Sequence, residues 1–178
     1  MISKRKFSAI SAGAVFAASA AIGLASFSAH AGSSPQSSQF LVSLTVQKDC
    51  TIIAGNALNF GTATSSYITT AINGTTTFTV TCTNTTPYHL SLDKGSTTSS
   101  TILSRLLLGG TTSATVPYQL YTDSSYGTIW GDGTNGSTVA GTGTGQAQVI
   151  TVNGQALSTG SMPAPDTYTS TETVTVTF

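Results

Sequence analysis

Charge is scarce in this chain of 178 residues, because Asp, Glu, Lys and Arg together make up only 7% of it. Three of the six basic residues lie within the first six positions, which leaves Lys48, Lys94 and Arg105 against six acidic residues. A surface of this composition has no basic patch that could neutralise phosphates. The sequence therefore excludes nucleic acid as an expected partner, and anionic membrane surfaces for the same reason.

The residue types that catalyse reactions or bind metals are also few. Only two histidines occur, His30 and His89, and the carboxylates are scattered without a nucleophile motif. We therefore expect neither an enzyme nor a bound cofactor or metal. Asp123 and Asp132 could form a carboxylate pair or a calcium site, but Asp in turns rich in Gly, Ser and Thr is ordinarily a local hydrogen-bonding residue. Trp130 could stack on a sugar, although a lone aromatic residue among apolar neighbours is more often part of the core.

The first 31 residues have the pattern of a secretory signal. Lys4, Arg5 and Lys6 precede a stretch of small and apolar residues at positions 7–27, and an A-x-A cleavage motif ends at Ala31. We predict a signal peptide over residues 1–31 and a single exported domain after it. A membrane anchor is the weaker interpretation of this segment, and no later stretch is long and apolar enough to span a bilayer.

The chain has only two cysteines, Cys50 and Cys82, and both lie in the part that is expected to be exported. An oxidising compartment favours a disulfide between them. A reactive or metal-binding pair of thiols would need companions, and His89 is the one histidine in this part of the sequence. We therefore predict a Cys50–Cys82 disulfide.

Threonine is abundant where charge is rare. All 34 threonines lie beyond residue 31, and Thr favours strands over helices, so the domain should be nearly all β. Apolar and polar residues alternate at 77–82, 88–92, 116–121 and 147–152, which predicts four strands. Residues 102–110 fit a short helix or a buried strand, and their length and terminal Gly-Gly favour the strand.

Turn signals divide these predicted strands. Asn73-Gly74, Asn135-Gly136 and Asn153-Gly154 combine residues that tolerate the positive φ of a type I′ hairpin turn. Residues 124–146 are rich in Gly, Ser and Thr, which predicts a loop and a hairpin tip. The chain is therefore expected to fold back on itself repeatedly, as in a β-sandwich.

A further alternating run lies at residues 40–46, almost at the start of the expected exported chain. Its apolar face consists of Phe40, Val42, Leu44 and Val46. Only a polar stretch precedes it and Lys48-Asp49-Cys50 follows it directly, so no local segment is available to cover this face. Such a strand has to join a sheet elsewhere.

The last alternating run covers residues 168–178. Val174, Val176 and Phe178 lie on one face, and Tyr168 opens the run. The sequence ends within this predicted strand, which suggests a sandwich with an open hydrophobic edge. A strand from one copy could complete the sheet of the next, a known mode of strand addition. Periodicity alone supports equally the alternative that residues 40–46 form the first strand of their own sandwich.

The order of several short motifs resembles the spore coat protein U family. The run of residues 40–46 is followed by Cys50, by Leu-Asn-Phe-Gly at 58–61 and by Phe-Thr-Val-Thr-Cys at 78–82. The closing segment, from residue 163 through Tyr168 to Phe178, is also similar to that family. One small departure is that Asp166-Thr167 precedes Tyr168, where many members have Gly.

This resemblance implies a fold and a function. The family includes subunits of archaic, Csu-type chaperone–usher pili, through which Gram-negative bacteria attach to surfaces and form biofilms. The implied fold is all-β, an incomplete immunoglobulin-like β-sandwich completed by donor-strand complementation. The implied parts are a signal peptide (1–31), a donor segment (32–48) and a β-sandwich domain (49–178), and the cysteines match the family disulfide.

The resemblance also implies partners and roles for the two terminal runs. A periplasmic chaperone would cover the open edge at Tyr168, Val174, Val176 and Phe178, and an outer-membrane usher would exchange it for residues 40–46 of a neighbouring pilin subunit at the cell surface. A shaft subunit fits better than a two-domain tip adhesin. The alternative is a secreted spore-coat-like or surface-binding module that acts without polymerisation.

Overall fold

A computed structural model describes residues 32, 35–64 and 69–178. The predicted signal peptide, residues 1–31, lies outside the described residues. The chain falls into two units that divide between Ser43 and Leu44, and each is described by itself.

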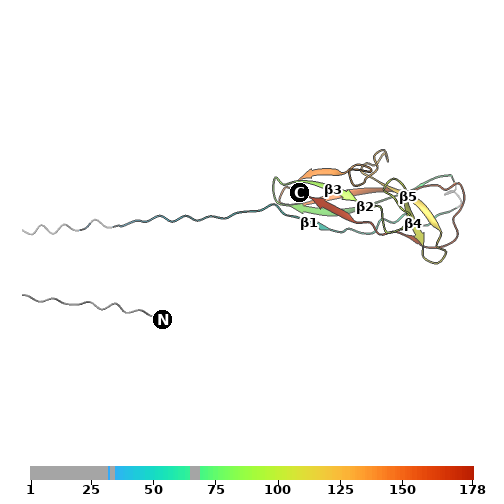
Figure 1. The fold of residues 1–178 in the computed structure, drawn as a ribbon, viewed down its shortest axis with the longest axis horizontal. Coiled ribbons are helices and arrows are strands. Elements are labelled where there is room, and N and C mark those ends of the chain that lie inside the picture. The colour runs from blue at the N-terminus through green and yellow to red at the C-terminus, as the bar shows by residue number, and fades with distance from the viewer. Residues whose placement is uncertain (1–31, 33–34, 65–68) are drawn as a thin grey trace, which may run out of the picture. The chain divides into compact units, whose positions relative to one another are not determined.

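The described residues form strands, turns and loops without a helix, in two antiparallel sheets (Figure 1). In order across the first sheet, the six strands are β1 (Cys50–Ile53), β2 (Ile72–Cys82), β7 (Ala147–Ala156), β5 (Thr115–Tyr121), β4 (Arg105–Gly109) and β8 (Tyr168–Thr169). The three strands of the second sheet are β6 (Val139–Thr142), β3 (Pro87–Leu92) and β9 (Val174–Thr177). The all-β prediction is therefore confirmed.

The core contains the apolar faces that alternation predicts. The buried side chains come from β2, β3, β5 and β7 and from Trp130; they are Phe78, Val80, Cys82, Tyr88, Leu90, Leu92, Tyr118, Leu120, Trp130 and Val152. Successive side chains of a strand point to opposite faces, so every second residue of these strands enters the core. Trp130 is fully buried, and its indole Nε1 donates a hydrogen bond of 3.0 Å to the Leu90 carbonyl. Trp130 is therefore a core residue and offers no platform for a sugar.

The predicted disulfide is present. Cys50 and Cys82 are directly opposite in the ladder of β1 and β2, and their sulfur atoms are bonded at 2.04 Å. The bond ties the edge strand β1 to the long central strand β2. Residues 105–109 of the ambiguous run at 102–110 form strand β4, which confirms the strand interpretation.

The predicted loop at 124–146 is partly wrong, because it contains β6, which pairs with β3. Gly141 explains how this strand fits. A Cβ atom at Gly141 would lie 2.3 Å from Cζ of Tyr88, so only glycine leaves room for the buried ring. The repeated Gly-Thr pattern therefore allows close packing of a strand.

Two of the three predicted turns are also wrong. Asn73-Gly74 lies inside β2 and Asn153-Gly154 inside β7, and the two glycines are directly opposite in the ladder. A Cβ at Gly74 would lie 3.1 Å from Leu58, and one at Gly154 only 2.7 Å from it. Glycine in a strand often marks such a close approach. Asn135-Gly136 does lie in a loop, where Gly136 has a φ of 75°.

Candidate functional site

An open groove of about 630 Å³ runs along one side of the sandwich. One wall is the stretch of residues 54–58 that follows β1, and the other is residues 170–174, which lead into β9. The floor is mainly apolar and consists of Phe78, Leu92, Leu107, Tyr118, Leu120 and Val152. The groove therefore lies directly over the hydrophobic core between the two sheets.

Both sheets end at this groove. Among the described residues β1 pairs only with β2, and β9 pairs only with β3. Figure 1 shows β9, in dark red, beside β1 and β3. The outer sides of β1 and β9 thus present backbone groups that a further strand can bind.

Three of the four residues predicted at the groove edge lie together. Val174 lines the groove, Val176 is half-buried against the core, and Phe178, just beyond β9, is 50% exposed. Tyr168 lies elsewhere: it pairs with Gly109 in the other sheet as part of β8. The run at 168–178 is therefore two short strands, because the chain crosses from one sheet to the other between them.

The residues predicted as a donor strand have no strand partner among the described residues. The four apolar side chains of this face are between 74% and 88% exposed; they are Phe40, Val42, Leu44 and Val46. Residues 40–46 are thus an unpaired segment with exposed apolar alternation.

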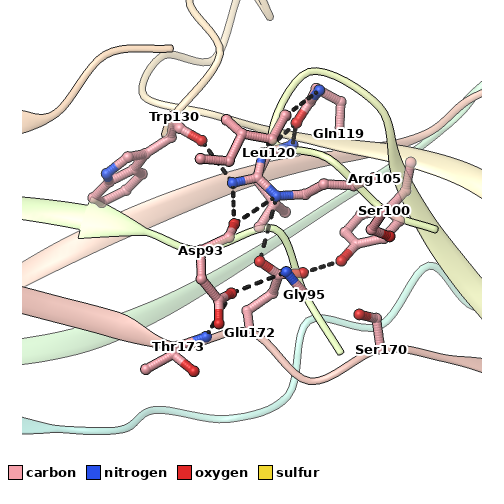
Figure 2. Close-up of polar contacts among 12 residues, drawn as sticks. Asp93, Gly95, Ser100, Arg105, Gln119, Leu120, Trp130, Ser170, Glu172 and Thr173 are labelled. Carbon is pink, nitrogen blue, oxygen red and sulfur yellow. Dashed lines mark hydrogen bonds and ion pairs between the residues drawn. The ribbon is translucent and has the colours of Figure 1, made fainter. Parts of the chain in front are cut away.

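Sequence reasoning missed a charged pair beside the groove floor (Figure 2). Arg105, on β4, is fully buried, and its Nε lies 3.4 Å from Oε2 of Glu172, a carboxylate that lines the groove. The hydroxyl of Tyr118 donates a hydrogen bond to the other oxygen of Glu172. Arg105 lies on β4 and Glu172 in the connection between β8 and β9, 67 positions further along the sequence, and no local pattern relates the two.

The guanidinium of Arg105 is held by backbone groups as well. It donates to the carbonyls of Asp93 at 2.6 Å, Trp130 at 2.9 Å and Ile102 at 3.1 Å, and also to the side chain of Gln119. Figure 2 shows Asp93, Trp130 and Gln119 arranged around the guanidinium. A buried charge with this many partners is fixed in position.

Burial shifts the pKa of both Glu172 and Tyr118, the two partners of a hydrogen bond at the groove. It raises the pKa of the Glu172 carboxyl above its ordinary value, although the Tyr118 hydroxyl and Arg105 act in the opposite direction. Burial also raises the pKa of Tyr118, and hydrogen bonding to Glu172 raises it further. Tyr118 is therefore a neutral donor throughout the physiological range.

The rarity of the two residues was the available signal. Glu172 is the only glutamate in the sequence, and Arg105 is the only arginine beyond the expected signal peptide. Glu172 also interrupts an otherwise uncharged alternating run, at a position on the same face as Val174. A lone charge on an inward face requires a partner.

The carboxylates of Asp123 and Asp132 accept hydrogen bonds within the loops that contain them. Asp123 accepts hydrogen bonds from the amides of Ser125, Gly127 and Thr128, and Asp132 accepts from two amides that follow it. These are the local hydrogen bonds expected of Asp in turns.

In the part of the chain that the structure describes, no cluster of His, Cys, Asp or Glu is suited to hold a metal ion. Nor do the described residues include a helix that could cross a membrane.

Asp123 leads to a testable pH dependence. Hydrogen bonds from Ser125, Gly127 and Thr128 lower the pKa of its carboxyl to about 2, below the ordinary 3.8. A depressed folded pKa gives stability above the unfolded pKa that is lost as the pH falls through the folded one. Asp123→Asn should therefore flatten the fall in melting temperature between about pH 4 and pH 2. An acid limb as steep as that of the unchanged protein would contradict this role.

Taken together, the two antiparallel sheets, the inter-strand disulfide and the groove between two sheet edges define an immunoglobulin-like β-sandwich with an unfilled strand position. Residues 36–177 match the Spore Coat Protein U domain, so the chain belongs to that family.

The chain is also similar to a solved structure, the pre-assembly complex of the CsuC chaperone and the CsuE tip adhesion subunit from archaic chaperone–usher Csu pili of Acinetobacter baumannii. The identity is 27% and the TM-score 0.53, over 75% of this chain. The match spans only 40% of that chain. No curated protein sequence matches this chain.

Proposed function

We propose that this protein is a structural subunit of a chaperone–usher pilus and polymerises by donor-strand complementation. In this proposal, residues 40–46 of one copy occupy the groove of the next. The observation that carries it is the combination of an apolar groove between two unpaired strand edges and an exposed, alternating apolar segment in the same chain.

The length of the segment and the energy of its burial are those expected of a donated strand. Seven residues in extended conformation span roughly 20 Å, the length of an ordinary strand. Burying the four apolar side chains of this segment contributes on the order of 10 kcal/mol before ordering costs. Hydrogen bonds to the backbone of β9 would add roughly 1 kcal/mol each. A monomer that acts without polymerisation would leave the apolar face of residues 40–46 exposed to water, which makes the coat-like alternative less favourable.

The partners follow from the same groove. A periplasmic chaperone would supply a strand to it before assembly, beside Val174, Val176 and Phe178, and an outer-membrane usher would exchange that strand for a neighbouring subunit's residues 40–46. The similarity to a subunit–chaperone complex supports this part of the proposal. The finished fibre would lie outside the cell and serve in surface attachment and biofilm formation.

The proposal assigns three parts to the sequence. Residues 1–31 direct export, residues 32–48 donate the strand, and residues 49–178 form the sandwich that accepts one. Tyr168 would contribute to the domain through β8, away from the groove.

Deleting residues 33–46 tests the proposal. The truncated subunit keeps every strand that the described part of the chain forms, so it should still be recovered with the chaperone. Lacking a segment to donate, it can accept a neighbour's strand but cannot fill a neighbour's groove. Expressed as the only subunit, it should therefore form no fibres, as measured by electron microscopy. Fibres of normal length made from the truncated subunit alone would show that another segment is the donor.

A further inference from the structure

We propose that Arg105 and Glu172 are positioning residues of the groove: their buried ion pair holds the wall against which the donor segment binds. This inference rests on the proposed function, because it concerns how firmly the same groove retains its strand.

The wall in question is residues 170–173, here called the crossing segment, which connects β8 in one sheet to β9 in the other. No strand pairing holds it. Its outer side is bound instead by the turn after β3. The amide of Thr173 donates to the Asp93 carboxylate at 3.0 Å, and the amide of Thr171 donates to the Ser96 hydroxyl at 3.0 Å.

Glu172 connects its inner side to the core. Glu172 points inward to Arg105 and Tyr118, as Figure 2 shows for Arg105. Arg105 in turn is fixed by backbone carbonyls from the end of β3 and from Trp130. Glu172 therefore ties the crossing segment to the core, in addition to the contacts that bind the segment to the turn after β3.

The ion pair of Arg105 and Glu172 also lowers the cost of removing water from the Glu172 carboxylate when a donor strand binds. The side chain of Glu172 is still 19% exposed, and a strand inserted beside it would remove part of the remaining water. A carboxylate that loses water without a partner strongly opposes burial, whereas one paired with a guanidinium and a hydroxyl tolerates it. Tyr118 donates a hydrogen bond to Oε1 of Glu172, and the guanidinium of Arg105 neutralises the charge at Oε2, which has no hydrogen bond of its own. The charge of Glu172 is therefore compensated before an apolar donor binds beside it.

The test compares Glu172→Gln with Asp166→Asn in the full chain, assembled into fibres. Asp166 is a matched control, since its carboxylate accepts hydrogen bonds at 2.7 to 3.0 Å from Thr111 and Thr112, in the turn between β4 and β5, and does not line the groove. Tyr118→Phe is a second variant, which keeps the ion pair and loses only the hydroxyl.

Two quantities are measured for each variant: the rate at which subunits leave the fibre in moderate denaturant, and the melting temperature of the chaperone-bound subunit. Glu172→Gln fibres should release subunits about tenfold faster or more, because a broken buried pair costs at least that factor. Tyr118→Phe should give a smaller increase. Asp166→Asn should release subunits at the unchanged rate once each rate is measured at the same interval below the melting temperature of that variant.

The outcomes separate this inference from the proposed function. If Glu172→Gln and Asp166→Asn release subunits equally fast at the same interval below their melting temperatures, the ion pair of Arg105 and Glu172 is merely structural. The inference is then wrong, while donor-strand assembly stands. If Glu172→Gln cannot be recovered with the chaperone, the milder Tyr118→Phe decides by the same comparison. If the unchanged chain forms no fibres that depend on residues 40–46, the proposed function itself fails.

Discussion

Replacing Leu44 by Asp should abolish fibre formation. Leu44 is at the centre of the apolar face of residues 40–46 and is 88% exposed in the free chain, so the substitution costs the unassembled subunit little. In the groove the new carboxylate would meet an apolar floor without a partner, at a cost of several kcal/mol. A penalty of that size lowers the equilibrium constant for strand insertion by a factor of about one thousand or more.

Ser43→Asp is the matched control. Neighbouring residues of a strand point to opposite faces, so position 43 would face away from the groove when position 44 faces into it. Fibre yield on the cell surface should stay near normal for Ser43→Asp and vanish for Leu44→Asp, with chaperone-bound subunit present for both. Equal loss in both variants would indicate a general folding defect, and equal retention would mean that these residues do not polymerise the protein.

Removing the disulfide should have the second-largest effect. The bond closes a loop of 32 positions, for which the chain-entropy treatment gives about 3 to 4 kcal/mol of stability. It also holds β1, an edge strand that pairs only with β2 among the described residues and leads directly into a groove wall. The double variant Cys50→Ala, Cys82→Ala should therefore lose most of its stability and assemble poorly.

The measurement is denaturant unfolding of the double variant and of the unchanged protein, each as the free subunit, in the fibre and bound to the chaperone. Unchanged protein with a chemically reduced disulfide is a second comparison. Labelling of the unchanged protein under denaturing, non-reducing conditions should find no free thiol. A double variant as stable as the unchanged protein would show that core packing alone holds β1 in place.

Alternation predicted the central strands because each has one buried face. In β2 and β3 every second residue enters the core, as at Phe78, Val80 and Leu90, so the sequence periodicity records the burial directly. The disulfide was predictable for a different reason, namely that only two cysteines exist in a chain expected to be exported.

The failed turn predictions have a tertiary cause. Asn-Gly tolerates positive φ, but Gly74 and Gly154 are in extended strands, where the missing side chains make room for Leu58. A local pattern cannot distinguish these two uses of glycine. Similarly, the crossing between β8 and β9 follows from pairing with two different sheets, which periodicity over residues 168–178 does not encode.

The ion pair of Arg105 and Glu172 could not be predicted from the sequence, for a related reason. Arg105 and Glu172 meet only after both sheets have formed, and nothing near either residue in sequence indicates the other. The scarcity of charge showed that each needed a partner, but the choice of partner depends on the fold.

Disulfide trapping between two copies tests the central claim most directly. One population carries a single added cysteine in the donor segment, at Val42 or Leu44, and the other carries Val174→Cys in the groove. Paired strands bring opposite residues within bonding range of a disulfide. If residues 40–46 fill a neighbour's groove, mixed fibres should yield a disulfide-linked dimer of the two populations, and Ser43→Cys, on the opposite face, should yield little. Trapping within single chains only, or equal trapping at position 43, would contradict the account.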